Sequence, residues 1–228
     1  MAIKLAVFDI SGTTVEDKDY VAEALVKAFE KQDLFISHKH ANTKMGIPKP
    51  LVIRELLNDI FEETPEDFEA LVSNIHADFI QTMIDFYQTD KNVKAKTNAV
   101  RTMLALKNAG VKVALDTGFS KQIADAIIDR LGWDIQQVVD FWVASDEVKQ
   151  GRPHADMVLK AMEIAGVTDS KEVAKIGDTE SDLGEGTAAG CKYIIGLTTG
   201  AQPRSVLEKT NHTHLVDDLY EVVNIVLN

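Results

Sequence analysis

Four short segments of this chain concentrate its chemically useful side chains. They are residues 9–14 (DISGTT), 115–118 (LDTG), 151–153 (GRP) and 177–182 (GDTESD). Together they supply carboxylates, hydroxyls, a guanidinium and glycines whose backbone amides can approach a ligand closely. This set suits a divalent cation beside a phosphoryl group, and an enzyme is the leading interpretation.

The aspartates of the first and last segments are candidates for a nucleophile and for metal ligands. Asp9 ends a strand-like apolar run and precedes Gly12 in a tight turn, so its carboxylate could attack phosphorus and form an acyl phosphate. Asp178 and Asp182 are four residues apart, which places both on one face of a turn or helix start. Converging carboxylates repel one another unless a cation lies between them, and Mg²⁺ prefers such hard oxygen ligands.

The remaining polar groups are candidates for phosphate binding. Thr117 and the backbone amides around Gly118 are expected to hold phosphate oxygens, as are Gly12 and Thr13 in the first segment. Arg152 is expected to neutralise the charge that builds on the transferring group.

Lys149 is an alternative to Arg152 as the cation that neutralises the transferring group. Two acids near these segments are expected to lie outside the site. Asp116 alternates with Thr117 along its strand and is expected to point away from the site. Glu185 is expected to be solvated on its helix.

The elements that must position these residues alternate along most of the chain. Three of the four segments directly follow apolar, β-branched runs, so they should lie at the carboxyl ends of strands, where open α/β sheets bind ligands. Strand-like runs alternate with helical periodicity after residue 91, which predicts a parallel sheet with helices on both faces. Helical periodicity alone fills the stretch before it, with helices expected over 21–29, from Pro50 to 57, and over 65–87. We therefore expect an α/β core of residues 1–15 and 92–228, interrupted by an all-helical cap of residues 16–91.

Composition narrows the class of partner. The chain has 228 residues and a formal net charge of −12 at pH 7, and such an acidic surface disfavours nucleic acid and anionic lipid. The single cysteine, Cys191, cannot form an internal disulfide and is expected to be a packed thiol. No signal peptide or membrane-spanning run is evident, so we expect a cytoplasmic protein with a small-molecule substrate.

In their order and setting, the four segments resemble the haloacid dehalogenase (HAD) superfamily of aspartate-nucleophile hydrolases, with a Rossmann-like core. The resemblance covers the whole chain, including the helical insertion after the first strand. It implies that Asp9 is the nucleophile. It also implies that Mg²⁺ is bound by the backbone carbonyl of Ser11 and by Asp178 and Asp182, the last directly or through water. The glycine-arginine-proline form around Arg152 is typical of phosphonoacetaldehyde hydrolase and its relatives.

The sequence departs from most phosphatases of this superfamily at position 11. They carry a second aspartate there, two residues after the nucleophile, that protonates the leaving group and then activates water. Ser11 cannot act as an acid or base near neutral pH in the way that a carboxylate can. The metal contact survives because it uses the backbone. Proton transfer must therefore come from elsewhere, or the leaving group must need little help.

Phosphonoacetaldehyde hydrolase also lacks that aspartate, and the chain is similar to it over residues 12–15 and 45–49. Lys49 falls on the lysine with which that family forms a Schiff base. The family's histidine three residues later is Val52 here, and its tyrosine after the Thr-Gly pair is Phe119. Lys49 could therefore form an imine, contact substrate through its charge, or be a solvated surface residue.

These observations favour a magnesium-dependent, phosphonatase-like hydrolase that cleaves a small phosphorylated or phosphonylated metabolite through an aspartyl-phosphate on Asp9. Phosphonoacetaldehyde hydrolase itself, cleaving a C–P bond through Lys49, is the first alternative. A phosphometabolite-binding or regulatory module that has lost turnover is the second. The resemblance also implies a homodimer formed through the cap.

Overall fold

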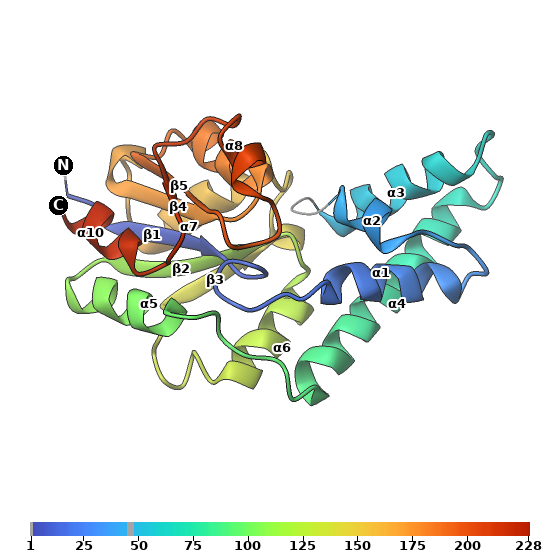
Figure 1. Cartoon of the computed structure of the whole chain (residues 1–228), viewed down its shortest axis with the longest axis horizontal. Helices are drawn as coiled ribbons and strands as arrows, with labels where there is room; N and C mark the ends of the chain where they lie inside the picture. Colours follow the sequence, from blue (N-terminus) through green and yellow to red (C-terminus); the bar gives the residue numbers. More distant parts are fainter. Residues whose placement is uncertain (1, 45–47) are drawn as a thin grey trace.

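The computed structural model describes residues 2–44 and 48–228. Its centre is a six-stranded parallel sheet with strand order β3-β2-β1-β4-β5-β6 (Figure 1). The strands are β1 (Leu5–Asp9), β2 (Lys112–Thr117), β3 (Phe141–Ala144), β4 (Val173–Gly177), β5 (Tyr193–Leu197) and β6 (His214–Val216). The predicted fold class is confirmed.

Helices cover both faces of the sheet, which explains why its central strands are apolar on both sides. On one face, Ala6, Phe8 and Leu115 join the larger hydrophobic core. On the other face, Leu5 and Val7 join a second core. The helices packed on the sheet are α5 (Ala99–Asn108), α6 (Lys121–Leu131), α7 (Asp156–Ala165) and α8 (Glu180–Ala189), and α10 (Glu221–Leu227) packs against α5.

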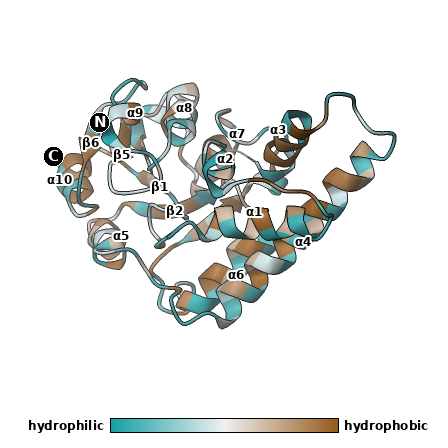
Figure 2. Ribbon diagram, turned by 45° about the vertical axis from the view of Figure 1, so that its right-hand side comes forward, coloured by the Kyte–Doolittle hydropathy of each residue, from teal (hydrophilic) through white to brown (hydrophobic). Residues whose placement is uncertain are grey.

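A group of helices follows β1 and lies beside the sheet rather than on either face (Figure 1). They are α1 (Tyr20–Glu30), α2 (His38–Asn42), α3 (Lys49–Ile60) and α4 (Phe68–Thr89). Apolar and polar residues alternate around α1 and α4 (Figure 2), and their apolar sides pack together. This group corresponds to the predicted helical insertion, and the exact boundaries of a cap domain stay a prediction.

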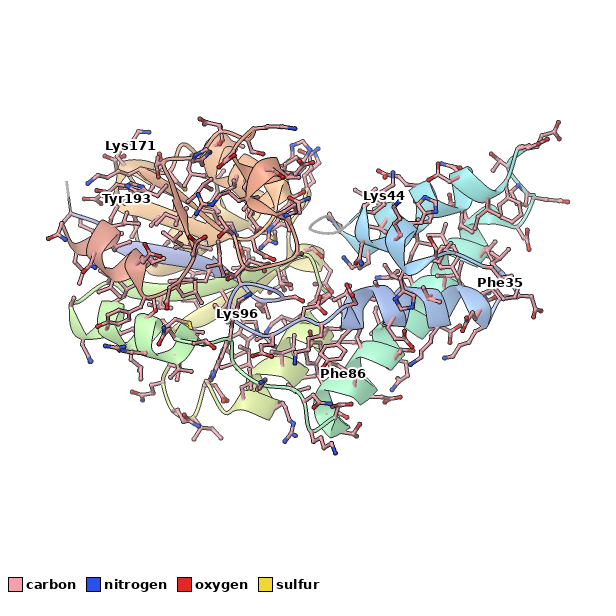
Figure 3. All side chains as sticks on the ribbon, viewed as in Figure 1. Phe35, Lys44, Phe86, Lys96, Lys171 and Tyr193 are labelled. Atoms are coloured by element: carbon pink, nitrogen blue, oxygen red, sulfur yellow. The ribbon has the colours of Figure 1, made fainter. Side chains whose placement is uncertain are left out.

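The chain leaves β1 and returns to the core through two adjacent connections. Val15 and Ala95 form an antiparallel bridge. Lys96, labelled in Figure 3, donates from Nζ to the carbonyls of Gly12 (2.7 Å) and Thr199 (2.6 Å). The entry and exit of the helical insertion are thereby fastened beside the loop that follows Asp9.

Most predicted elements are present, and the differences lie in short pieces. The helical pattern of the sequence also predicts helices over 153–165 and 217–227, which in the structure begin at Asp156 and Glu221. The short helices α2 and α9 (Arg204–Leu207) were not predicted. None of the helices in the described ranges is long and apolar enough to cross a membrane.

Candidate active site

The sheet brings three of the four segments to one edge. β1 lies between β2 and β4, so the carboxyl ends of these strands are neighbours. Asp9 ends β1, Thr117 ends β2, and Asp178 directly follows β4. Asp182 lies in the first turn of α8, whose N-cap Thr179 accepts a hydrogen bond from the backbone of Asp182.

The three predicted metal ligands form one buried carboxylate cluster. Asp9, Asp178 and Asp182 each offer a carboxylate oxygen, and these oxygens lie within 4.8 Å of one another. Burial raises the pKa of Asp9 well above its usual range, although Arg152 opposes the shift. Burial and the nearby Asp182 raise the pKa of Asp178 to about 6. Clustered hard oxygens fit a divalent cation such as Mg²⁺, which would relieve the repulsion between the carboxylates.

Close packing orients the carboxylate of Asp178. Thr13 Oγ1 donates to its Oδ1 (2.7 Å), and the backbone N–H of Ala201 donates to its Oδ2 (2.6 Å). Gly12, with φ of +90°, and Gly200 lie so close that a Cβ at either position would overlap this carboxylate. The Thr13 hydroxyl, predicted to bind phosphate, is thus bonded to Asp178. Sequence reasoning missed the contribution of residues 199–201.

Arg152 is buried and contacts the candidate nucleophile directly. Its Nη1 donates to Asp9 Oδ1 (2.6 Å) and lies 2.9 Å from Asp182 Oδ1, while Nε donates to Glu185 Oε2 (2.9 Å). Burial opposes its charge, but the surrounding acids raise the pKa of Arg152 well above its usual range. Lys149, the alternative cation, is exposed. Arg152 is therefore the guanidinium placed to meet a phosphoryl group on Asp9.

A second buried cation lies behind Arg152. Lys175, in the middle of β4, is fully buried; it donates to Asp116 Oδ1 and lies 3.1 Å from Glu185 Oε2 and 3.3 Å from Asp182 Oδ1. The solvated position predicted for Glu185 was wrong, because the α8 face that carries Asp182 also buries Glu185. Asp116 does not line the cavity but hydrogen-bonds Arg152 Nη2. Sequence reasoning did not single out Lys175.

The pKa values of two acids in this network, Glu185 and Asp116, are shifted in opposite directions. Burial and the nearby Asp116 raise the pKa of Glu185 to about 8. Burial opposes the charge of Asp116, but Arg152 and Lys175 lower its pKa below its usual value. Of the two acids, Glu185 is therefore the one that holds a proton more readily, and Asp116 favours the ionised form that Arg152 and Lys175 contact.

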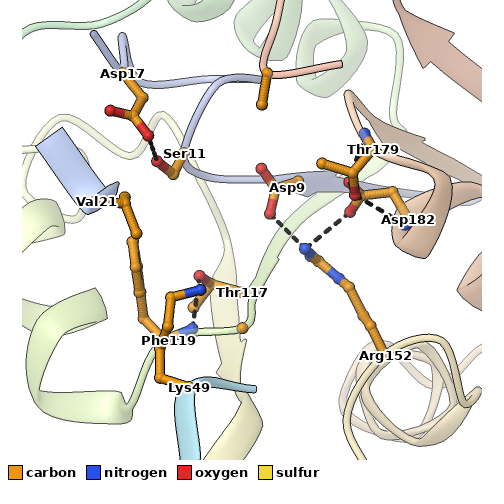
Figure 4. Close-up of a pocket in the computed structure, with 12 residues that line it drawn as sticks. Asp9, Ser11, Asp17, Val21, Lys49, Thr117, Phe119, Arg152, Thr179 and Asp182 are labelled. Carbon is orange, nitrogen blue, oxygen red and sulfur yellow. Dashed lines mark hydrogen bonds and ion pairs between the residues drawn. The ribbon is translucent and has the colours of Figure 1, made fainter. Parts of the chain in front are cut away.

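A cavity of about 410 Å³, including its part open to solvent, lies between the carboxylate cluster and the helical insertion (Figure 4). Thr117 and Gly118 line it beside Asp9, as expected of phosphate-binding groups. From the insertion side come Val21 and Lys49. The further residues that line it are Ser11, Asp17, Phe119, Arg152, Thr179, Asp182 and Ala201.

Lys49 is buried, which excludes its interpretation as a solvated lysine. Its Nζ lies 5.7 Å from the centroid of the Phe119 ring. Burial lowers the pKa of Lys49 to about 8, against the opposing effect of Asp17 and Asp9. Val52, at the place of the family histidine, is fully buried. Residues 45–47 of the similar stretch lie outside the described residues.

The chain has a parallel α/β core with helices inserted after its first strand, and an aspartate cluster and a buried guanidinium lie at the carboxyl edge of the sheet. The model of the haloacid dehalogenase-like hydrolases matches residues 3–190. The chain belongs to this family and is a hydrolase.

Known relatives and structures agree with this assignment. Phosphonoacetaldehyde hydrolase from Bacillus cereus is 27% identical over 240 residues, covering 100% of this chain and 88% of that protein. A phosphonoacetaldehyde hydrolase-like protein from Oleispira antarctica superposes with a TM-score of 0.80 at 18% identity, covering 99% and 93%. A hydrolase from Pseudomonas syringae superposes with a TM-score of 0.83 at 19% identity, covering 98% and 97%. The phosphonatase-like relationship is thus confirmed.

Proposed function

We propose that this protein is a magnesium-dependent hydrolase that cleaves a small phosphorylated or phosphonylated metabolite through an aspartyl-phosphate on Asp9. The observation that carries the proposal is the meeting of Asp9, Asp178 and Asp182 within 4.8 Å, with Arg152 bonded to Asp9. Mg²⁺ would be held by these carboxylates and by the backbone carbonyl of Ser11. When bound, the ion would neutralise phosphoryl oxygens and orient them.

The residues divide the reaction between them. A carboxylate oxygen of Asp9 attacks phosphorus while the bond to the leaving group breaks, and the leaving group departs with its electron pair. Thr117, the amides near Gly118 and the guanidinium of Arg152 hold the phosphoryl oxygens during this transfer. Water then attacks the phosphorus of the acyl phosphate, releasing inorganic phosphate and restoring Asp9.

Phosphonoacetaldehyde hydrolysis is the second candidate, favoured by Lys49 lining the same cavity. An imine between its neutral amine and the substrate aldehyde releases one water molecule. Attack of Asp9 on phosphorus then breaks the C–P bond, and the protonated imine accepts the electron pair of that bond to become an enamine. Protonation of the enamine carbon and hydrolysis by water release acetaldehyde and restore Lys49. The lowered pKa of Lys49 supports this role, whereas Val52 and Phe119 replace two residues of that family.

We further propose that residues 16–91 act as a cap that excludes water during reaction, and that the protein pairs through this cap as a homodimer. A small polar substrate suits the site, because the cavity is narrow and lined by charged groups.

Phosphate release tests the proposal. Acetyl phosphate, a set of small phosphate esters and phosphonoacetaldehyde are offered to the wild type and to Asp9→Asn, with Mg²⁺ and with EDTA. We expect turnover of at least one compound by the wild type with Mg²⁺, and loss of turnover in Asp9→Asn or EDTA. Turnover that survives Asp9→Asn contradicts the nucleophile assignment. Binding of these compounds without any turnover supports instead a phosphometabolite-binding module.

Borohydride separates the two substrate classes. With phosphonoacetaldehyde, it should reduce an imine to a stable adduct on Lys49, visible as a mass increase that Lys49→Arg abolishes. Turnover of phosphate esters with no adduct favours the ester substrate.

A further inference from the structure

Asp17 is the acid of the cavity that the proposed reaction does not use. Among the described residues lining the cavity, the acids are Asp9, Asp182 and Asp17. Asp17 belongs to the connection between β1 and α1 and lies across Asp9 from Arg152 (Figure 4). It therefore lies on the side of Asp9 away from the guanidinium that is proposed to hold the phosphoryl group.

Its carboxylate is held in place by the protein. Oδ1 accepts a hydrogen bond from the backbone N–H of Tyr20 (2.8 Å), at the start of α1. Oδ2 accepts one from Ser11 Oγ (3.2 Å), the residue two positions after the candidate nucleophile. Asp17 is half-buried and also lines two neighbouring hollows, so it lies at the mouth of the cavity.

When a substrate binds, the Asp17 carboxylate loses hydrogen bonds to water, and the free-energy cost of that loss depends on the substrate. An ionised carboxylate has about four lone-pair sites, more than Ser11 and Tyr20 fill. A substrate that enters the cavity displaces the water on the remaining sites. An apolar leaving group would leave them unpaired, whereas a hydroxyl or ammonium group would restore a hydrogen bond. Sites of this kind reject analogues that lack the donor.

We propose that Asp17 is a specificity-determining residue that accepts a hydrogen bond from a donor on the leaving group. The substrate class is then a phosphoryl compound with a short leaving group that carries a hydroxyl or an ammonium group. This inference rests on the proposed function, because it places the leaving group between Asp9 and the mouth of the cavity.

Three matched esters test the inference: ethyl phosphate, 2-hydroxyethyl phosphate and 2-aminoethyl phosphate. The wild type should prefer at least one of the two donor-bearing esters to ethyl phosphate by roughly tenfold or more in kcat/KM. Asp17→Ala should reduce that preference to less than about threefold. The preference is a ratio measured within each variant, so a general loss of activity in Asp17→Ala does not affect the comparison.

Asp17→Asn and Asp19→Asn complete the design. An asparagine at position 17 can still accept the hydrogen bond from the backbone N–H of Tyr20. This variant therefore removes the negative charge and keeps the hydrogen bond at the start of α1. In Asp17→Asn, the kcat/KM ratio relative to ethyl phosphate should fall more for 2-aminoethyl phosphate than for 2-hydroxyethyl phosphate. Asp19 is exposed and accepts a hydrogen bond from Asn42 (3.0 Å), so Asp19→Asn is the control and should keep the wild-type preference.

The outcomes separate the inference from the proposed function. If the wild type hydrolyses none of acetyl phosphate, the phosphate esters and phosphonoacetaldehyde, the proposed function fails; calorimetric binding of the three esters to Asp9→Asn then still reports whether a donor improves affinity. If any of these compounds is hydrolysed but the wild type treats the three esters alike, or if Asp17→Ala keeps the preference, the inference is overturned.

Discussion

Replacing Lys175 by methionine tests the buried network behind Arg152. Methionine fills a similar volume but removes the cation that lies against Asp116, Glu185 and Asp182. Lys175 is fully buried, and breaking a buried ion network by removing one partner typically costs about 3–5 kcal/mol. Arg152 still neutralises Asp116, and the raised pKa of Glu185 favours its neutral form, so we expect a loss near the lower figure.

Thermal unfolding measures this loss. For a chain of this length 1 kcal/mol corresponds to about 2–4 °C in Tm, so Lys175→Met should lower Tm by at least about 6 °C at pH 7 in EDTA. The double variant Lys175→Met with Asp116→Asn removes one charge of each sign, so it should recover at least half of the loss. Lys27→Met is the control, because Lys27 makes an exposed pair with Glu23 whose contribution is about 0.3–0.5 kcal/mol.

The double-mutant cycle decides the interpretation. A Tm change below about 2 °C for Lys175→Met would show that its charge does not stabilise the acids around it. Additive losses in the double variant would show that Lys175 and Asp116 contribute independently to stability. That result would contradict the coupling inferred from their contact in the network.

Three further predictions concern protonation and metal binding. The raised pKa of Glu185 gives stability that is full below about pH 4.5 and is lost as pH rises through about 8. In EDTA, the free energy of unfolding should therefore fall from pH 5 to 8.5 more steeply in the wild type than in Glu185→Gln. Gly200→Ala should weaken Mg²⁺ binding at least about tenfold in calorimetry, because its Cβ would displace the Asp178 carboxylate; Gly166→Ala, with open space around it, should not. If Lys49 forms an imine, borohydride trapping should accelerate from pH 6.5 to 8.5, since the neutral amine becomes the main form above its pKa of about 8; a rate that is flat over this range would contradict that role.

The parts of the fold that could be predicted from sequence are those whose signals are local. β1, β2 and β4 are apolar runs that end in polar residues, and their parallel pairing brings those ends to one edge. β6 has three residues and α9 has four, too few for periodicity to show.

The missed residues of the site are those whose surroundings come from distant segments. Lys175 interrupts an apolar strand, which is itself a signal, but its partners lie on β2 and α8. Glu185 could have been found, because it lies three residues after Asp182 and so shares its helix face. Ala201 approaches Asp178 only because β4 and β5 are neighbours, which no local pattern indicates.

The buried cations explain how so acidic a protein can accept an anionic substrate. With a net charge of −12, the surface as a whole repels a phosphoryl group. Within the site, however, Arg152 contacts Asp9 and Lys49 lines the same cavity. Charges in a buried site interact more strongly than charges separated by solvent. Salt at about 0.1 M screens interactions between surface charges that are more than about 10 Å apart. Affinity for substrate should therefore depend on these two side chains and on the metal, and raising the ionic strength should improve association rather than weaken it.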